Sequence, residues 1–277
     1  LKLWVGKRIP LVHLLPFYPY TSDDGFSVVD YLEVHPDYGD WMDIRGFSKD
    51  YGLMFDAVFN HISAQSKWVK GYLSGDPNYE NYCISVDPQT DLSGVIRPRA
   101  LPLLTLFESL NGPKHLWTTF SEDQVDINIK NPKILLNLVE ILLFYVSQGA
   151  RLIRLDAIAF LWKEIGTNCI HLKQTHEVVK LFRDCLNIVA PDTLIITETN
   201  VPHKENISYF GEDGDEAQLV YQFPLPPLTA HAILTNSSLC LQLWASGLEL
   251  PNQFCTFFNT MASHDGVGVR GAEGILS

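Results

Sequence analysis

The sequence ARLIRLD at residues 150–156 is a short apolar run that ends in the carboxylate of Asp156. Near-continuous apolar runs of this length are typical of parallel strands that are covered on both faces. The same pattern predicts five more strands, each ending in polar residues. They lie at residues 10–16, 53–60, 193–198, 219–222 and 257–264.

Helical patterns separate several of these strands. Asn131 can cap a helix, Pro132 suits the first helical position, and Gly149 suits the stop, so a helix is predicted between them. A second helical pattern runs through residues 169–189. Strands that alternate with helices predict right-handed βαβ units and therefore an α/β fold with a parallel sheet.

The composition excludes several functional classes. The chain has 277 residues, of which 46% are hydrophobic and 19% charged, so it is not intrinsically disordered. A net charge of −12 makes nucleic acid an unfavourable partner. No apolar run reaches the roughly 20 residues that a membrane span requires, and no signal peptide is visible. Five widely spaced cysteines are typical of reduced thiols, so we expect a cytoplasmic protein and leave its oligomeric state open.

Residues 63–124 interrupt the alternation of strands and helices. This stretch is rich in Gly, Pro, Asn and Asp and also carries Trp68 and Trp117, which indicates an insertion with a small core of its own. We therefore expect three parts. They are barrel residues 1–62, an insertion at 63–125 and barrel residues 126–277.

Three acidic residues stand at the ends of predicted strands. In a parallel barrel the strand ends that carry Asp156, Glu198 and Asp265 gather on the C-terminal face, where active sites are built. Two such carboxylates are what glycosidic bond cleavage needs, one as nucleophile and one as acid. Arg154 lies two residues before Asp156, on the same face of the strand, and favours its ionised form. For any one acid, a helix cap or a surface ion pair stays open as the alternative.

Four segments resemble the conserved regions of the α-amylase superfamily of glycoside hydrolases, in the order of that family. They are DAVFNH at 56–61, RLIRLDA at 151–157, ITET at 196–199 and ASHD at 262–265. Four longer stretches are similar to the subfamily of sucrose phosphorylases, which also contains glucosylglycerate phosphorylases. They are HLLPFYPYTSDDGF at 13–26, WKEIG at 162–166, TETNVPH at 197–203 and YQFPLPP at 221–227.

This resemblance implies a (β/α)8 barrel and roles for particular residues. Asp156 matches the nucleophile that forms a covalent glucosyl-enzyme, Glu198 the general acid and base, and Asp265 the stabiliser of the transition state. Arg154 matches the arginine that orients the nucleophile. Four more residues match those that hold the glucosyl group. They are Asp23, His61 and His264, which bind its hydroxyls, and Phe26, the aromatic platform beneath it.

The resemblance also implies an activity. We expect retaining phosphorolysis of sucrose or glucosylglycerate to α-glucose 1-phosphate, with inorganic phosphate as co-substrate and no cofactor. In some members of the superfamily the residue matching Asn60 helps to bind calcium, which this subfamily generally lacks, so we expect no metal. Carboxylate geometry alone suits a retaining α-glucosidase or transglycosylase equally well, and an inactive, truncated sugar-binding chain is a third reading. The acceptor is not determined by these residues.

Two features depart from the subfamily pattern. Only about six of the eight barrel strands are visible, so we expect the first and last strands and the C-terminal β-domain to be missing, as in a fragment. Gly271 also follows Arg270 where the subfamily usually has proline, so we expect a looser loop after Asp265.

Overall fold

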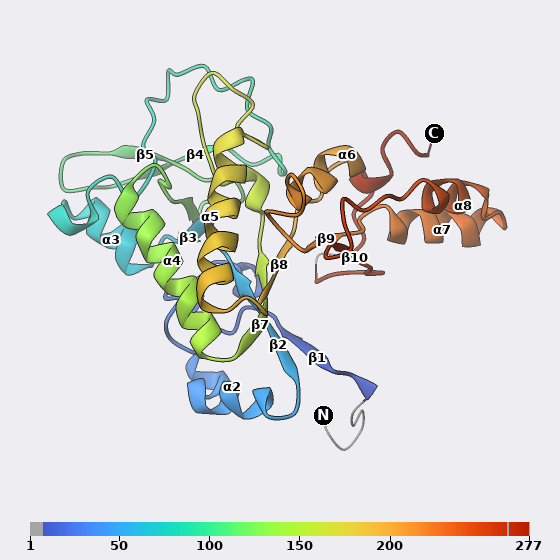
Figure 1. Ribbon diagram of the computed structural model, residues 1–277. Helices are drawn as coiled ribbons and strands as arrows, with labels where there is room; N and C mark the ends of the chain where they lie inside the picture. Colours follow the sequence, from blue (N-terminus) through green and yellow to red (C-terminus); the bar gives the residue numbers. More distant parts are fainter. Residues whose placement is uncertain (1–7, 265, 277) are drawn as a thin grey trace.

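The computed structural model describes residues 8–264 and 266–276. Its centre is a sheet of six parallel strands in the order β1-β2-β7-β8-β9-β10 (Figure 1). The six runs predicted to be strands all contribute to this sheet. The strands are β1 (Leu11–Leu14), β2 (Gly52–Ala57), β7 (Ala150–Leu155), β8 (Leu194–Thr197), β9 (Leu219–Tyr221) and β10 (Thr256–Phe258).

Helices lie in the connections between successive strands of the sheet. This is the order of a (β/α)8 barrel, of which the described residues supply six strands, so the predicted α/β fold class is confirmed as an incomplete barrel. Figure 1 shows α4 and α5 running beside each other along the sheet. The helices are α2 (Trp41–Ser48), α4 (Pro132–Ser147), α5 (Lys173–Val189), α6 (His203–Asn206), α7 (Leu225–Thr235) and α8 (Leu239–Ser246).

Alternation along the strands divides the core into two clusters. Leu53, Phe55 and Ile153 belong to the large cluster that also includes residues of α4 and α5. Their neighbours Met54 and Leu152 point to the opposite face, where they pack with residues of β8 and β9 in a smaller cluster. The two clusters correspond to the helix-covered and inner faces of a barrel wall.

The segment predicted as an insertion leaves and rejoins the barrel at one place. Strand β3 (His61–Ser63) pairs antiparallel with β6 (Gln124–Asp126) and so brings the two ends together. Between them lie α3 (Lys67–Leu73) and the antiparallel pair of β4 (Leu104–Phe107) and β5 (Lys114–Trp117). The Trp117 side chain is buried in a separate small cluster that also includes Cys169 from outside this segment, whereas Trp68 packs against the large core cluster.

Local backbone geometry changes two of the sequence expectations. The helix expected from residue 169 begins at Lys173, because Cys169 and His171 both have φ of 53°, in the left-handed region. The run at 257–264 forms a strand only as far as Phe258. In the loop after residue 265, whose looseness relative to the subfamily stays a prediction, residues Arg270–Ala272 form a short 3-10 helix, η7, in which Gly271 is buried. Within the described residues, no helix is long and apolar enough to cross a membrane.

Candidate active site

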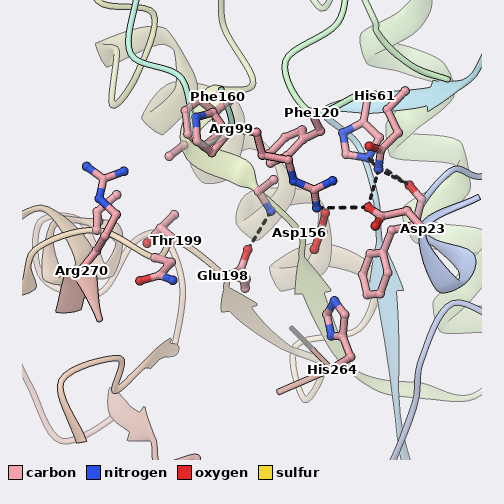
Figure 2. Close-up of a pocket in the computed structure, with 17 residues that line it drawn as sticks. Asp23, His61, Arg99, Phe120, Asp156, Phe160, Glu198, Thr199, His264 and Arg270 are labelled. Atoms are coloured by element: carbon pink, nitrogen blue, oxygen red, sulfur yellow. Dashed lines mark hydrogen bonds and ion pairs between the residues drawn. The ribbon is translucent and has the colours of Figure 1, made fainter. Parts of the chain in front are cut away.

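The carboxylates of Asp156 and Glu198 meet because their strands are neighbours. Asp156 follows β7 and Glu198 follows β8, and these two strands pair in parallel. The Arg154 guanidinium links the two acids, since its Nη1 donates to Asp156 Oδ1 at 2.7 Å and its Nη2 lies 3.9 Å from Glu198 Oε2. The structure thus brings together three residues that the sequence placed in the site. Figure 2 shows the side chains of Asp156 and Glu198 at the ends of their strands.

The turn after Asp156 also orients Glu198. Ala157 has φ of 48°, in the left-handed region that alanine rarely adopts, and its backbone N–H donates to Glu198 Oε2 at 3.2 Å. Residues held in such sparsely populated conformations cluster at functional sites, where surrounding contacts maintain them. Here the unusual turn gives the general acid candidate a fixed hydrogen-bond donor.

A second buried carboxylate shares the arginine. Arg154 Nη1 also donates to Asp56 Oδ1 at 2.6 Å, and His13 Nε2 lies 2.7 Å from Asp56 Oδ2. Burial alone would raise the pKa of Asp56, but the attraction of Arg154 and the contact with His13 outweigh it and lower that pKa. Burial opposes the charge of Arg154 as well, yet the surrounding carboxylates, Asp56 first, hold its pKa well above the usual value. The guanidinium therefore stays charged beside Asp156.

Residues from the loop after β1 and from β3 form one wall of the site. Asp23 Oδ2 accepts from Gln124 Nε2 at 2.8 Å and lies 3.5 Å from the Arg99 guanidinium. His61 Nε2 lies 2.9 Å from the Phe26 carbonyl, and burial lowers the pKa of this histidine, which favours the neutral ring. Neutral histidine and aspartate are suitable partners for the hydroxyls of a sugar.

The Phe26 ring has two close neighbours. His264 stacks on it with ring centroids 4.3 Å apart and planes inclined by 11°, while the Arg154 guanidinium lies 5.5 Å from the ring centroid. In this arrangement His264 covers a face that a sugar would stack on, so a platform role for Phe26 requires the His264 side chain to shift. Asp265, the predicted third acid, lies outside the described residues.

These side chains surround a cavity of about 310 Å³. That volume is at the lower end of the range for small-molecule sites. Arg154 is buried behind Asp156 and does not line the cavity, whereas six other predicted residues do. They are Asp23, Phe26, His61, Asp156, Glu198 and His264.

Sequence reasoning missed several residues that complete the site. Asp56 was quoted within a motif but given no role, although a carboxylate inside the apolar run at 53–60 was the available signal. Its strand register places it opposite Arg154. No comparable feature of the sequence marks Tyr221, whose hydroxyl accepts a hydrogen bond from Arg154 Nε at 3.1 Å. Gln124 and Arg99 come from the insertion, where nothing in the sequence indicates which polar residue turns inward.

A buried lysine occupies the surroundings of Asn60. Lys163 Nζ donates to Asn60 Oδ1 at 2.6 Å and pairs with Asp126 Oδ2 at 2.5 Å, and its side chain is 3% exposed. The Lys163 ammonium group therefore lies directly between the side chains of Asn60 and Asp126. Within the described part of the chain, no three His, Cys, Asp or Glu residues are grouped as metal ligands.

Comparison with known proteins places this geometry in context. A profile of the α-amylase catalytic domain matches residues 8–250. The chain is 60% identical over 265 residues to a glucosylglycerate phosphorylase of Allomeiothermus silvanus, covering 96% of this chain and 48% of that protein. It is 54% identical over 274 residues to a glucosylglycerate phosphorylase of Escherichia coli, covering 99% and 49%. The chain therefore spans about half the length of the curated relatives it matches.

A solved structure shows the same fold. The crystal structure of sucrose 6F-phosphate phosphorylase from Thermoanaerobacter thermosaccharolyticum superposes with a TM-score of 0.85. The two sequences are 22% identical, and the match covers 97% of this chain and 56% of that one. At this identity the similarity supports the barrel architecture alone.

Proposed function

The chain belongs to the α-amylase family, and on that premise we propose that its protein is a retaining disaccharide phosphorylase. The proposed reaction converts an α-glucoside, glucosylglycerate or sucrose, and inorganic phosphate into α-glucose 1-phosphate. Phosphate is a co-substrate, and no cofactor or metal takes part. We further propose a cytoplasmic location, and we treat residues 63–125 as the insertion that contributes Arg99 and Phe120 to the cavity.

The observation that carries this proposal is the contact of one buried arginine with two carboxylates at neighbouring strand ends. Arg154 touches Asp156 at 2.7 Å and approaches Glu198 at 3.9 Å. The ion pair with Arg154 holds the Asp156 carboxylate in place, as a nucleophile needs, while Glu198 lies at the cavity wall where it can exchange protons with a substrate. Retention at an anomeric carbon requires two carboxyl groups, one that acts as the nucleophile and one that acts as the acid and base.

The proposed reaction has two steps. Asp156 attacks the anomeric carbon, the bond to the leaving oxygen breaks, and Glu198 gives its proton to that oxygen. A phosphate oxygen then attacks the glucosyl-enzyme, its proton passes to Glu198, and the bond to Asp156 breaks. Two inversions give net retention, so the product is the α-anomer. Asp265 is proposed to stabilise the positive charge that develops on the sugar in the transition state of each step.

The residues of the opposite wall are proposed to hold the glucosyl group. Asp23 and His61 line the cavity and offer an acceptor and a neutral ring to its hydroxyls. His264 is proposed as a further hydroxyl partner once it leaves the Phe26 ring, which then becomes the platform under the sugar. Stacking of an aromatic ring against the apolar face of a sugar contributes to binding alongside the hydrogen bonds.

Support for phosphate as the acceptor comes from the relatives named above. The carboxylates and arginine would serve a retaining α-glucosidase or transglycosylase equally well. The proteins that are 54% and 60% identical to this chain are named glucosylglycerate phosphorylases. Sucrose phosphorylases, such as that of Bifidobacterium adolescentis at 31% identity, are more distant. Glucosylglycerate is therefore the first substrate to test.

The test is product analysis with and without phosphate. The purified protein is incubated with glucosylglycerate or sucrose, and glucose 1-phosphate and free glucose are measured. Glucose 1-phosphate that forms only when phosphate is present supports the proposal. Free glucose at the same rate in both conditions identifies a hydrolase, and the absence of any product supports an inactive sugar-binding chain.

A further inference from the structure

The cavity has two chemically different ends, with Glu198 between them. Asp23 and His61 lie at one end, and Arg270 lies at the other, beyond Glu198 and Thr199 (Figure 2). A general acid lies next to the oxygen that leaves with the second half of the substrate. The end that holds Arg270 is therefore the end where the leaving group and the phosphate would lie.

The arginines around the cavity differ in how closely carboxylates neutralise their charges. Arg154 is held by two carboxylates at 2.6 and 2.7 Å, and Arg99 lies 3.5 Å from Asp23 and over the ring of Phe120. Arg270 pairs with Glu273 at 3.8 Å, and both side chains are largely exposed, at 43% and 58%. Exposed pairs of this kind contribute little, because water screens them. Its charge remains available to a ligand.

The backbone that carries Arg270 is firmly packed. A Cβ atom on Gly271 would lie 2.6 Å from the carbonyl carbon of Phe223, so this glycine allows a close approach that other residues would prevent. Ala272 is buried, and its N–H donates to the Val269 carbonyl at 3.0 Å. The guanidinium therefore extends into the cavity from a fixed base.

A buried acceptor is supplied by Asn200, which follows Thr199 and whose amide lies against Gly268. Asn200 lines the cavity, and its Oδ1 is buried without a hydrogen-bond partner among the described residues. A buried carbonyl oxygen left without a donor is unfavourable, so a hydroxyl group that binds there gains a favourable contact. Arg270 and Asn200 together suit a small molecule that carries both an anion and a hydroxyl.

We infer that Arg270 binds the carboxylate of a glycerate acceptor and so selects glycerate over uncharged polyols. This inference rests on the proposed function, whose glucosylglycerate substrate contains that carboxylate. A guanidinium pairs with a carboxylate through two parallel hydrogen bonds. It also offsets the repulsion that an anion would meet from Asp156 and Glu198. Phosphate is an anion too, so the experiment must separate the two ligands.

The experiment runs the reaction in reverse with one donor and two acceptors. α-Glucose 1-phosphate is supplied with either D-glycerate or glycerol, which differ in the carboxylate. For wild type, we expect glycerate to be the better acceptor. Arg270→Gln should lower kcat/KM for glycerate about 10- to 100-fold, mainly through KM, because a hydrogen bond to a charged group contributes about 1.5–3 kcal/mol. The rate with glycerol should stay within about threefold, well short of a tenfold change.

Two further variants control this result. Arg151→Gln removes the same charge from the exposed start of β7, at the end of the strand away from Asp156. This variant should leave kcat/KM for both acceptors unchanged. Arg270→Lys keeps the charge without the paired donors and should recover part of the glycerate activity. Thermal unfolding of each variant verifies that the fold is intact.

The remaining outcomes contradict the inference in distinguishable ways. An equal loss on both acceptors would assign Arg270 to the phosphoryl group of the common donor. No loss on either acceptor, or a wild-type preference for glycerol, would remove its role in selection. If wild type transfers glucose to neither acceptor, the proposed function itself fails, and the inference fails with it.

Discussion

Replacing Arg154 by methionine tests the electrostatics of the site. The side chain is 3% exposed, and its Nη1 contacts Asp56 Oδ1 at 2.6 Å and Asp156 Oδ1 at 2.7 Å. Methionine keeps an unbranched apolar chain but removes the charge and every donor. The variant therefore leaves Asp56, which is fully buried, without its cation.

The size of the effect follows from that burial. Breaking a buried ion pair by removing one partner costs about 3–5 kcal/mol. For a chain of this length, 1 kcal/mol corresponds to about 2–4 °C in Tm. We therefore expect Arg154→Met to lower Tm by about 6–20 °C near pH 7, because both factors multiply.

The pH dependence identifies the cause. In the native protein the pKa of Asp56 is lowered, so its ionisation stabilises the fold above its unfolded pKa of about 3.9, and this stabilisation is lost as the pH falls through the folded value. Without Arg154, we expect burial to outweigh the remaining contact with His13 and to raise the folded pKa of Asp56 above the unfolded one. Ionisation of Asp56 then opposes folding, and the variant should regain stability as the pH falls from 7 towards 5.

The assay is calorimetric unfolding of both proteins between about pH 4 and 8, a range that starts near the unfolded pKa. Arg183→Met is the matched control, since Arg183 is also 3% exposed but donates to the uncharged oxygens of Thr193 and Gln218 at 2.8 Å. The stability difference between Arg183→Met and wild type should not become smaller as the pH is lowered. Two results would refute this reasoning. One is a stability difference between Arg154→Met and wild type that stays constant with pH. The other is a loss of stability below about 1 kcal/mol, which is what an exposed ion pair contributes.

Three further substitutions test separate parts of the site. Asp156→Asn should lower kcat by several orders of magnitude with unchanged circular dichroism, and activity within about tenfold of wild type would exclude it as nucleophile. Glu198→Gln should slow natural glucosides far more than glucosyl fluoride, whose leaving group needs no proton; equal losses in kcat/KM on both donors would show that Glu198 is not the acid. Lys163→Met should destabilise the protein by about 3–5 kcal/mol in denaturant unfolding, because Asp126 stays buried, and a change under about 1 kcal/mol would contradict this pairing.

The strands could be predicted because short apolar runs in the sequence indicate which segments are buried. Runs such as ARLIRLD at 150–156 are largely apolar, and each of the six contributed a strand to the parallel sheet. The order of neighbours followed from chain order, so the adjacency of Asp156 and Glu198 was within reach. The start of the second long helix was not, because the positive φ of Cys169 and His171 depends on how that loop packs.

The polar contacts around these acids were harder to predict. Asp56 and Arg154 are 98 positions apart, and only the register between β2 and β7 sets them side by side. The stacking of His264 on Phe26 likewise depends on the path of the chain after β10, beyond any local pattern. The insertion supplies Arg99 and Gln124 from irregular segments without periodicity, so their inward orientation could not be read from sequence.

The most direct measurement is to identify the residue that carries the glucosyl group during turnover. A slow-reacting fluorinated glucosyl fluoride is used to trap the covalent intermediate, and the labelled protein is digested and sequenced by mass spectrometry. Attachment to the Asp156 carboxylate is the expected result, together with α-glucose 1-phosphate as the first product observed by NMR. A label on another side chain, or a first product with the β configuration, would contradict the assignment of this site.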